Sequence, residues 1–227
     1  MQVTEACEQC RVFEGVKATS MQKFINYGVL RNYTKKELIF REWEPGTRFY
    51  FVASGYVALY KTNQRHDRKV IFILGPGEML NEVIAEEPMA SISCMALGTV
   101  SILSCGREQL LSIMERDLIL YRNVMRSMAQ KLRRTYHQLG NASNMMSLKM
   151  QAASKLWKLA RDFGVAEQGE IRIPFEISIT FFADMMGSKR ETVSRILKEI
   201  CEQDALKISR NYFYILDVEK LKNIVEN

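Results

Sequence analysis

A short run of charged and hydroxyl side chains, from Ser188 to Arg195, has the residue types that contact nucleic acids. An arginine can donate two hydrogen bonds to the O6 and N7 atoms of a guanine, and a glutamate can accept one from the N4 of a cytosine. Lysine and hydroxyl side chains bind phosphate oxygens and fix the register of a protein on DNA. The run therefore predicts contacts with both bases and phosphates.

The members of this run are expected to have different roles. Arg190, Glu191 and Arg195 are predicted to contact base edges, and Ser194 is a further candidate. An alternative reading is the solvated face of an ordinary amphipathic helix pair. The residues assigned to phosphate contacts are Ser188, Lys189 and Thr192.

These side chains need a rigid support, and residues 178–201 predict two short helices joined by a tight turn. Counted from Ile179, the fifth residue is Ala183, the ninth is Gly187 and the fifteenth is Val193. A small residue lets two helices cross closely, a glycine accepts the positive φ of the turn, and an aliphatic residue packs the second helix on the first. This spacing is typical of a DNA-binding helix-turn-helix. We expect serine caps at Ser178 and Ser188, one for each helix.

The segment ITFFADMMGSKRETVSRILKEI, residues 179–200, closely resembles the helix-turn-helix of the CRP/FNR family of bacterial transcription regulators. By this resemblance, Glu191 and Arg195 match residues shared by the cAMP-responsive and FNR-like branches, and Arg190 matches the former branch. In a dimer of this family, the two helix-turn-helix motifs enter successive major grooves of a palindromic site. We therefore expect double-stranded DNA and RNA polymerase as partners.

Residues 21–105 predict antiparallel β-structure. Short runs of β-branched and aromatic residues alternate with Gly/Pro turns, which is typical of a barrel or jelly roll. Gly46, Gly55 and Gly77 resemble the turn glycines of the cyclic-nucleotide-binding fold. The expected strands cover 38–40, 49–52, 56–60, 70–74, 92–97 and 100–103.

One long helix is predicted over residues 106–140, because apolar residues repeat there with heptad spacing. The repeat is longer than packing on the chain's own β-structure requires, although its first residues could pack in that way. We expect a parallel homodimer held by a coiled coil. The seam consists of Met114, Leu118, Tyr121, Met125, Met128 and Leu132, continued by Thr135 and Leu139.

The predicted fold class is α+β in three parts. Residues 1–105 form an effector-sensing β jelly roll with an N-terminal CxxC segment, residues 106–141 a dimerisation helix, and residues 142–227 a winged helix-turn-helix domain. Turn-forming residues at 140–144 indicate a hinge. The last part is expected to contain a helix at 147–163, a strand at 171–175, a hairpin at 206–216 and a final helix at 218–225 capped by Asp217.

The expected effector pocket departs from that of the cAMP-binding members of the family. Those members hold the ribose with the glutamate of a Gly-Glu pair and the cyclic phosphate with the arginine of an Arg-Ser pair. Glu82 matches the glutamate and Ser91 the serine, but Asn81 replaces the glycine and no arginine precedes Ser91. A cyclic phosphate would lack its charge-assisted partner. We expect a pocket that does not bind cAMP tightly. The sequence leaves three alternatives for the signal: an unidentified small molecule, nitrosative or redox stress through haem, an iron–sulfur cluster or Cys7 and Cys10, or no ligand at all.

Cysteine and histidine chemistry leaves alternatives open. Cys7 and Cys10 form a CxxC pair, which is half of a metal site or a redox pair. Oxygen sensors of the FNR branch hold an iron–sulfur cluster with four cysteines, and Cys105 is two residues out of register with the fourth. We assign no metal and expect an unliganded pair, with the cluster as the alternative. Haem is a further alternative, with His66 and His137 as candidate ligands.

Net charge, apolar runs and motif content limit the classes of function that we expect for this protein. The net charge of +6 suits a polyanionic partner. No apolar run approaches the roughly 18 residues of a transmembrane helix, and the N-terminus lacks a signal-peptide pattern, so we expect a cytoplasmic location. No nucleophile–base pair, HExxH motif or phosphate loop is present, and we do not expect an enzyme. The alternative function is a ligand-gated protein-interaction module without a DNA role.

Overall fold

The computed structural model describes residues 1–143 and 146–226, and the chain divides into two compact units. One unit comprises Met1–Lys61 and Ile71–His137, and the other comprises Thr62–Val70 and Gln138–Asn227. Within the described ranges, no helix has the length and apolar character needed to cross a membrane.

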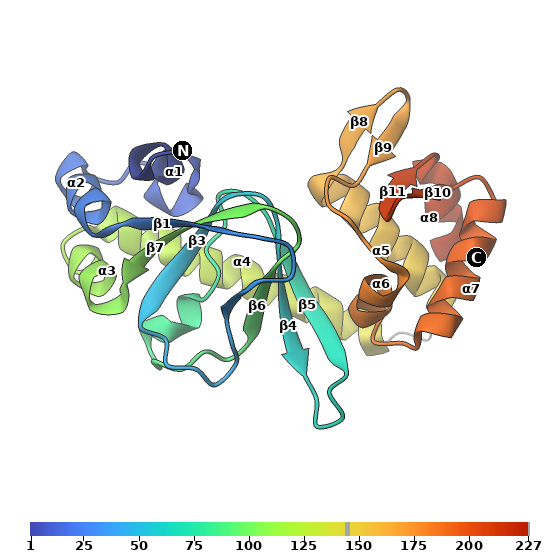
Figure 1. Cartoon of the computed structure of the whole chain (residues 1–227), viewed down its shortest axis with the longest axis horizontal. Helices are drawn as coiled ribbons and strands as arrows, with labels where there is room; N and C mark the ends of the chain where they lie inside the picture. Colours follow the sequence, from blue (N-terminus) through green and yellow to red (C-terminus); the bar gives the residue numbers. More distant parts are fainter. Residues whose placement is uncertain (144–145, 227) are drawn as a thin grey trace. The chain divides into compact units, whose positions relative to one another are not determined.

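Two β-sheets form the centre of the first unit (Figure 1). The strands are β1 (Val29–Tyr33), β2 (Leu38–Phe40), β3 (Arg48–Ser54), β4 (Val57–Thr62), β5 (Arg68–Leu74), β6 (Ser93–Ala96) and β7 (Val100–Gly106). One sheet has the order β1-β7-β3 and the other β2-β6-β4-β5. The pairs β1/β7, β3/β7, β2/β6 and β4/β6 are antiparallel. The jelly-roll prediction is confirmed, with β1 as an additional strand.

Alternate side chains of β3 and β7 belong to two different hydrophobic clusters. Val52 and Ile102 belong to a cluster shared by both sheets, whereas Phe51 and Leu103 belong to a second cluster with the helices. Successive side chains of a strand point to opposite faces, so β3 and β7 are buried on both sides, whereas the edge strand β1 is mostly exposed. Burial of each such side chain stabilises the fold by roughly 1.5–3 kcal/mol.

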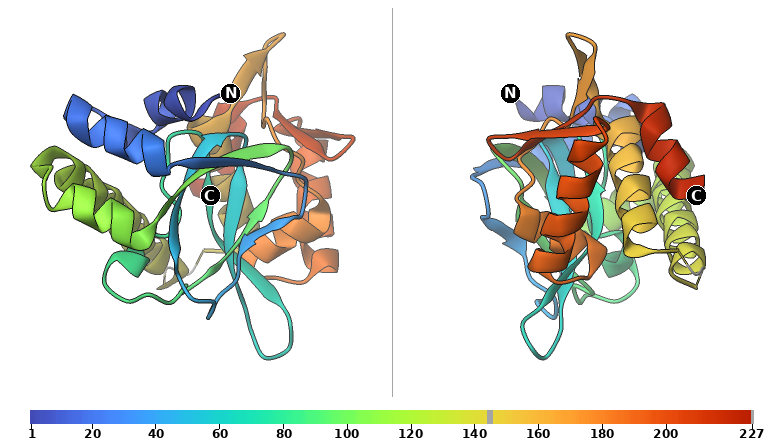
Figure 2. Two further views of the ribbon diagram at one scale, coloured as in Figure 1. Left: turned by 60° about the vertical axis from the view of Figure 1, so that its left-hand side comes forward. Right: turned by 90° about the vertical axis from the view of Figure 1, so that its right-hand side faces the viewer.

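Helices at the N-terminus cover the three-stranded sheet. They are α1 (Val3–Gln9), the 3₁₀ turn η1 (Arg11–Phe13) and α2 (Ala18–Tyr27). The ring of Phe13 lies 4.3 Å from that of Phe24 and 5.3 Å from that of Phe51, centroid to centroid. In the left panel of Figure 2, α2 (blue) lies beside α3 (Arg107–Met114, green). The prediction of β-structure from residue 21 was wrong, because residues 21–27 belong to α2.

The predicted long helix is two helices, α3 and α4 (Leu118–Ser143). Asp117 causes the break. Its carboxylate accepts hydrogen bonds from the backbone N–H groups of Ile119 (3.0 Å) and Leu120 (3.2 Å), which caps α4, and from that of Lys17 (3.0 Å). The prediction of one helix over 106–140 was therefore wrong. Met114 ends α3, and its side chain is buried in the unit's own core instead of lying in a seam.

The prediction of a hinge at residues 140–144 was wrong in part. Gly140 lies inside α4, which continues to Ser143, so the helix does not end where the turn-forming residues begin. Asn144, the last residue of the predicted hinge, lies outside the described residues.

The second unit contains a winged helix-turn-helix domain (Figure 1). Its elements are α5 (Leu148–Phe163), β8 (Val165–Glu167), β9 (Glu170–Arg172), α6 (Ile179–Met186), α7 (Arg190–Glu202), β10 (Leu206–Ser209), β11 (Tyr212–Ile215) and α8 (Val218–Glu226). The four strands form one sheet of order β10-β11-β9-β8. The predicted helices and the hairpin are confirmed, and β8 is additional. The strand predicted over 171–175 is shorter, because β9 ends at Arg172. Asp217 caps α8 by accepting a hydrogen bond of 2.8 Å from the Glu219 N–H.

Candidate functional site

Local sequence fixes the helix-turn-helix. The Ser178 hydroxyl accepts a hydrogen bond from the Phe181 N–H at 3.1 Å and starts α6. Gly187 ends α6 with φ +64°, a left-handed conformation that glycine adopts at little cost. The predicted cap at Ser188 was wrong, because Lys189 is the N-cap residue of α7 and no side chain caps that helix.

The inner face of α7 anchors it to the domain. Four aliphatic side chains at helical spacing are buried: Val193, Ile196, Leu197 and Ile200. On the adjoining α6, the ring of Phe182 lies 5.6 Å from that of Phe213 in β11, centroid to centroid. This packing holds the backbone of α7 in place, so the points from which its outer side chains extend are defined.

The outer face of α7 presents its charges to solvent. Lys189, Arg190, Glu191 and Arg195 are exposed, and the smaller Ser188, Thr192 and Ser194 are partly exposed. In the described part of the chain, none of the four charged side chains forms an ion pair or a hydrogen bond. The predicted base-contact and phosphate-contact residues thus lie together on one exposed surface. Their hydrogen-bonding groups are available to an external partner.

The hairpin of β10 and β11 adds a residue that the sequence reasoning missed. Arg210 and Asn211 have φ values of +49° and +65°, which form a tight two-residue turn. Arg210 is exposed at the tip of this wing. An arginine inside a predicted two-residue turn beside a helix-turn-helix is the signal that points to it as a further candidate for a phosphate contact.

Glu82, the predicted pocket glutamate, is buried beneath α4, and both of its carboxylate oxygens are hydrogen-bonded. It starts the 3₁₀ turn η2 (Glu82–Ala85) and its side chain is 3% exposed. One carboxylate oxygen accepts a short hydrogen bond from the Ser127 hydroxyl, and the other pairs with Lys131 Nζ at 2.5 Å. Lys131 also donates to the Met79 carbonyl at 2.6 Å and the Leu80 carbonyl at 3.3 Å. Sequence reasoning missed Lys131, because a heptad pattern marks it only as a polar position.

The other expected pocket residues are placed differently. Asn81 is buried and structural: its side chain accepts from the Tyr50 N–H at 3.0 Å and donates to the Arg48 carbonyl at 2.9 Å. Ser91 lies at an exposed bend before β6, and the preceding Ala90 is buried. Glu82 therefore faces α4, whereas Ser91 faces solvent.

The predicted seam residues after Met114 lie along α4. Leu118 is 70% exposed, and Tyr121, Met125 and Leu132 are about half exposed, while Met128 is partly buried. On an adjacent face of the same helix, Leu120 and Val124 pack into the core. The helix thus has an exposed apolar stripe in addition to its buried face, and such a stripe is typical of a helix–helix contact.

The CxxC thiols lie in the core instead of at a surface. Cys7 and Cys10 are 2% and 1% exposed. Burial, with smaller contributions from Cys105 and Glu8, raises the pKa of Cys7 to about 12, and burial together with Cys7 raises the pKa of Cys10 to about 12. A thiolate is the form that binds metals and attacks disulfides, and this environment disfavours it. Both histidines, His66 and His137, are exposed.

Two domain families match the chain. The cyclic nucleotide-binding domain matches residues 30–117, and the Crp-like helix-turn-helix domain matches residues 151–224. The first match covers both sheets, α3 and the break at Asp117. The second covers nearly all of the winged helix-turn-helix domain, including α7 and the wing.

Curated relatives align with this chain along nearly all of their length. The CRP-like cAMP-activated global transcriptional regulator of Mycobacterium tuberculosis is 24% identical over 96% of this chain and 97% of its own length. The Cyclic AMP receptor protein of Thermus thermophilus is 27% identical over 94% of this chain and 95% of its own length. The solved structure of FixK2 from Bradyrhizobium japonicum has a TM-score of 0.75 at 23% identity, covering 87% of this chain and 96% of that one. This last likeness shows a shared fold.

Proposed function

The chain belongs to the CRP/FNR family of transcription regulators, and from this premise we propose that it binds a palindromic DNA site as a homodimer. The observation that supports this proposal most is the exposure of Lys189, Arg190, Glu191 and Arg195 at the start of α7. None of these four side chains has a partner in the described part of the chain. Arg190, Glu191 and Arg195 contact bases, and Ser194 supports them. The phosphate contacts come from Ser188, Lys189, Thr192 and the wing residue Arg210.

The dimer forms through the apolar stripe of α4, from Leu118 to Leu132. Two such helices in parallel bury these side chains against each other and relate the two α7 helices by a two-fold axis. Met125→Asp places a carboxylate at the centre of this contact and should give monomers in sedimentation equilibrium. Arg133→Asp, on the same helix and exposed, is the matched control and should remain dimeric. An unchanged dimer in Met125→Asp would contradict the seam.

The β-domain controls DNA binding through α4, and we infer that cAMP is not its effector. Both oxygens of Glu82 already accept hydrogen bonds from α4, and Ala90 provides no cation where cAMP-binding members place an arginine. Ribose and cyclic phosphate would thus each lack their strongest partner. Calorimetric titration with cAMP should give no binding at micromolar concentrations, and a micromolar or tighter complex would contradict this inference.

DNA recognition is tested by fluorescence anisotropy with a palindromic duplex and a scrambled duplex of equal length. The palindrome should bind at least a hundredfold more tightly at fixed salt, within the range for specific regulators. Equal affinity for both duplexes would favour a protein-interaction module. RNA polymerase is the expected further partner on the bound promoter.

A further inference from the structure

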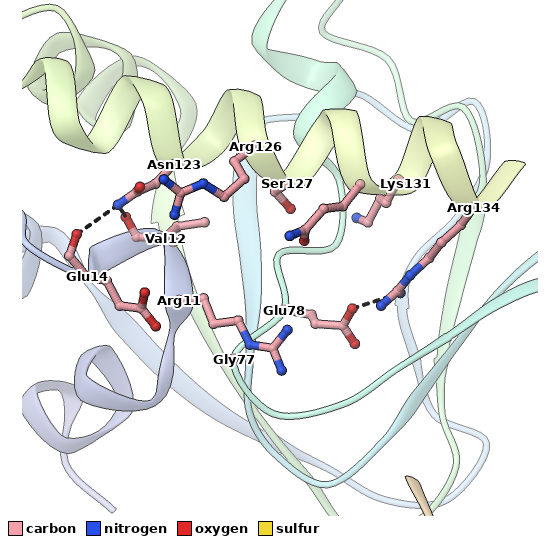
Figure 3. A pocket seen from close by; sticks show the side chains of 11 residues that line it. Arg11, Val12, Glu14, Gly77, Glu78, Asn123, Arg126, Ser127, Lys131 and Arg134 are labelled. Carbon is pink, nitrogen blue, oxygen red and sulfur yellow. Dashed lines mark hydrogen bonds and ion pairs between the residues drawn. The ribbon is translucent and has the colours of Figure 1, made fainter. Parts of the chain in front are cut away.

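A groove of about 190 Å³ in the first unit lies between α4, η1 and the turn at Gly77 (Figure 3). Arg11 lines it from η1, and Arg126, Gln130 and Lys131 line it from α4. Neither Glu82 nor Ser91, the residues matched to nucleotide-binding positions, is among its lining residues. The groove thus adjoins the position that the family resemblance indicates, through Ser127 and Lys131, but does not include it.

The walls of this groove are held in place by hydrogen bonds. The Asn123 side-chain amide of α4 donates to the Val12 carbonyl at 3.0 Å and to the Glu14 carbonyl at 2.9 Å, which ties η1 to α4. The Arg11 N–H donates to the Gly77 carbonyl at 3.1 Å. Gly77 has φ +86°, and a Cβ there would lie 2.6 Å from the Gln9 carbonyl oxygen. A fixed groove spares a ligand the cost of ordering its site.

Some charged side chains of the groove have ion-pair partners and others have none. Lys131 is paired with Glu82 at 2.5 Å, and Arg134 is paired with Glu78 at 3.0 Å. Across the described residues, the guanidinium groups of Arg11 and Arg126 have no hydrogen-bond or ion-pair partner. Figure 3 shows them coming from opposite walls, with Glu14 at one end. Two guanidinium groups against one unpaired carboxylate leave an excess of positive charge.

We propose that this groove binds a small organic anion that carries carboxylate or phosphate groups. Guanidinium groups pair with both kinds of anion through two parallel hydrogen bonds. Arg11 and Arg126 hold the anion from the two walls, and the Gln130 amide adds a neutral donor. The volume suits a metabolite-sized molecule and excludes a polymer.

A bound anion links η1 to α4 at the residue next to Met125 in the seam. The free energy of binding then favours one position of α4 relative to its own β-domain, which is how an effector shifts a conformational equilibrium. This regulatory consequence rests on the proposed function. The anion site itself does not.

The test is calorimetric titration of the full chain without DNA, using inorganic phosphate and malonate as separate probes. Sodium chloride keeps the ionic strength constant. The wild type should bind at least one probe, and the probe that binds identifies phosphate or carboxylate as the recognised group. Arg11→Gln and Arg126→Gln should each weaken binding at least tenfold.

Arg133→Gln is the matched control, because Arg133 is an exposed arginine of α4 outside the groove. It should bind like the wild type. Absence of binding by both probes, or equal weakening in Arg133→Gln, would overturn the proposal. Because the titration contains no DNA, a failure here leaves DNA recognition untouched, and a protein that binds the anion but no DNA would refute only the proposed function.

Discussion

The outer face of α7 and the buried surroundings of Glu82 use charge in opposite ways. At the start of α7, the side chains of Lys189, Arg190 and Arg195 are exposed and have no partner within the described residues. Around Glu82, each charged or hydroxyl group is turned inward and bonded to another part of the same unit. A group that recognises an external molecule must keep its hydrogen-bonding capacity free. The difference supports the proposal that α7 contacts a partner and that Glu82 has a structural role.

Breaking the buried pair should have the largest effect on stability. Lys131→Met leaves the Glu82 carboxylate without its countercharge, and we expect a loss of about 3 kcal/mol from the β-domain. The double variant Glu82→Leu with Lys131→Met should recover most of it, because no buried charge remains. Calorimetric unfolding measures both, with the exposed Arg133→Met as the control. If Lys131→Met unfolds like the control, Glu82 is not held by this pair.

The cap at Asp117 should have the next largest effect. Asp117→Ala removes the hydrogen bonds that start α4, and the expected loss is about 2 kcal/mol at neutral pH. Thermal unfolding at pH 7 measures it, with the exposed surface variant Glu115→Ala as a control. A variant as stable as the wild type would show that the break between α3 and α4 does not depend on this carboxylate.

Asp117 also predicts a pH dependence. Burial would raise the pKa of its carboxyl, but hydrogen bonds from the Ser20 side chain and the Lys17, Leu120 and Ile119 N–H groups outweigh it, and the pKa is lowered. A depressed folded-state pKa contributes stability above the unfolded-state value, and that stability is lost as the pH falls through the folded-state value. The difference in unfolding free energy between wild type and Asp117→Ala should therefore shrink below about pH 4.

Removing one base contact should have a smaller and more selective effect. Arg195→Ala should weaken binding to the preferred duplex about tenfold and leave binding to a scrambled duplex nearly unchanged. Fluorescence anisotropy at fixed salt measures both affinities. Lys198→Ala, an exposed change on the same helix, is the control. Equal losses on both duplexes would assign Arg195 to the phosphate backbone.

The smallest expected effect is at a single phosphate contact. Lys189→Ala should weaken binding to all duplexes alike and reduce the slope of log affinity against log salt concentration by about one. Arg210→Ala tests the wing in the same way. A slope equal to that of the wild type would mean that the side chain does not reach the DNA backbone.

The DNA-reading domain was predictable because its signals are local. Ser178 caps the helix that follows it, Gly187 supplies the left-handed turn nine residues later, and the buried face of α7 follows from helical periodicity. The wing residue Arg210 escaped prediction because only its place in the turn distinguishes it from a surface arginine. The serine cap at Ser188 was wrong by one residue, because Lys189 takes the N-cap position.

The sensing domain was less predictable because its decisive contacts join distant residues. Lys131 meets a carboxylate 49 residues earlier, and Asp117 meets the Lys17 N–H 100 residues earlier. A heptad pattern cannot show that Asp117 interrupts it, so Met114 was assigned to the seam instead of the core. The strands themselves were predictable from β-branched runs between Gly/Pro turns, but the helical residues 21–27 gave no comparable signal.

The most direct test of DNA reading by α7 is selection of binding sites from a random duplex library with the wild type and Arg195→Ala. We expect the wild type to enrich an inverted repeat with half-sites about one helical turn apart. Arg195→Ala should enrich the same repeat with one position per half-site relaxed. Enrichment of no sequence by the wild type, or an identical motif from both proteins, would contradict base reading by this face.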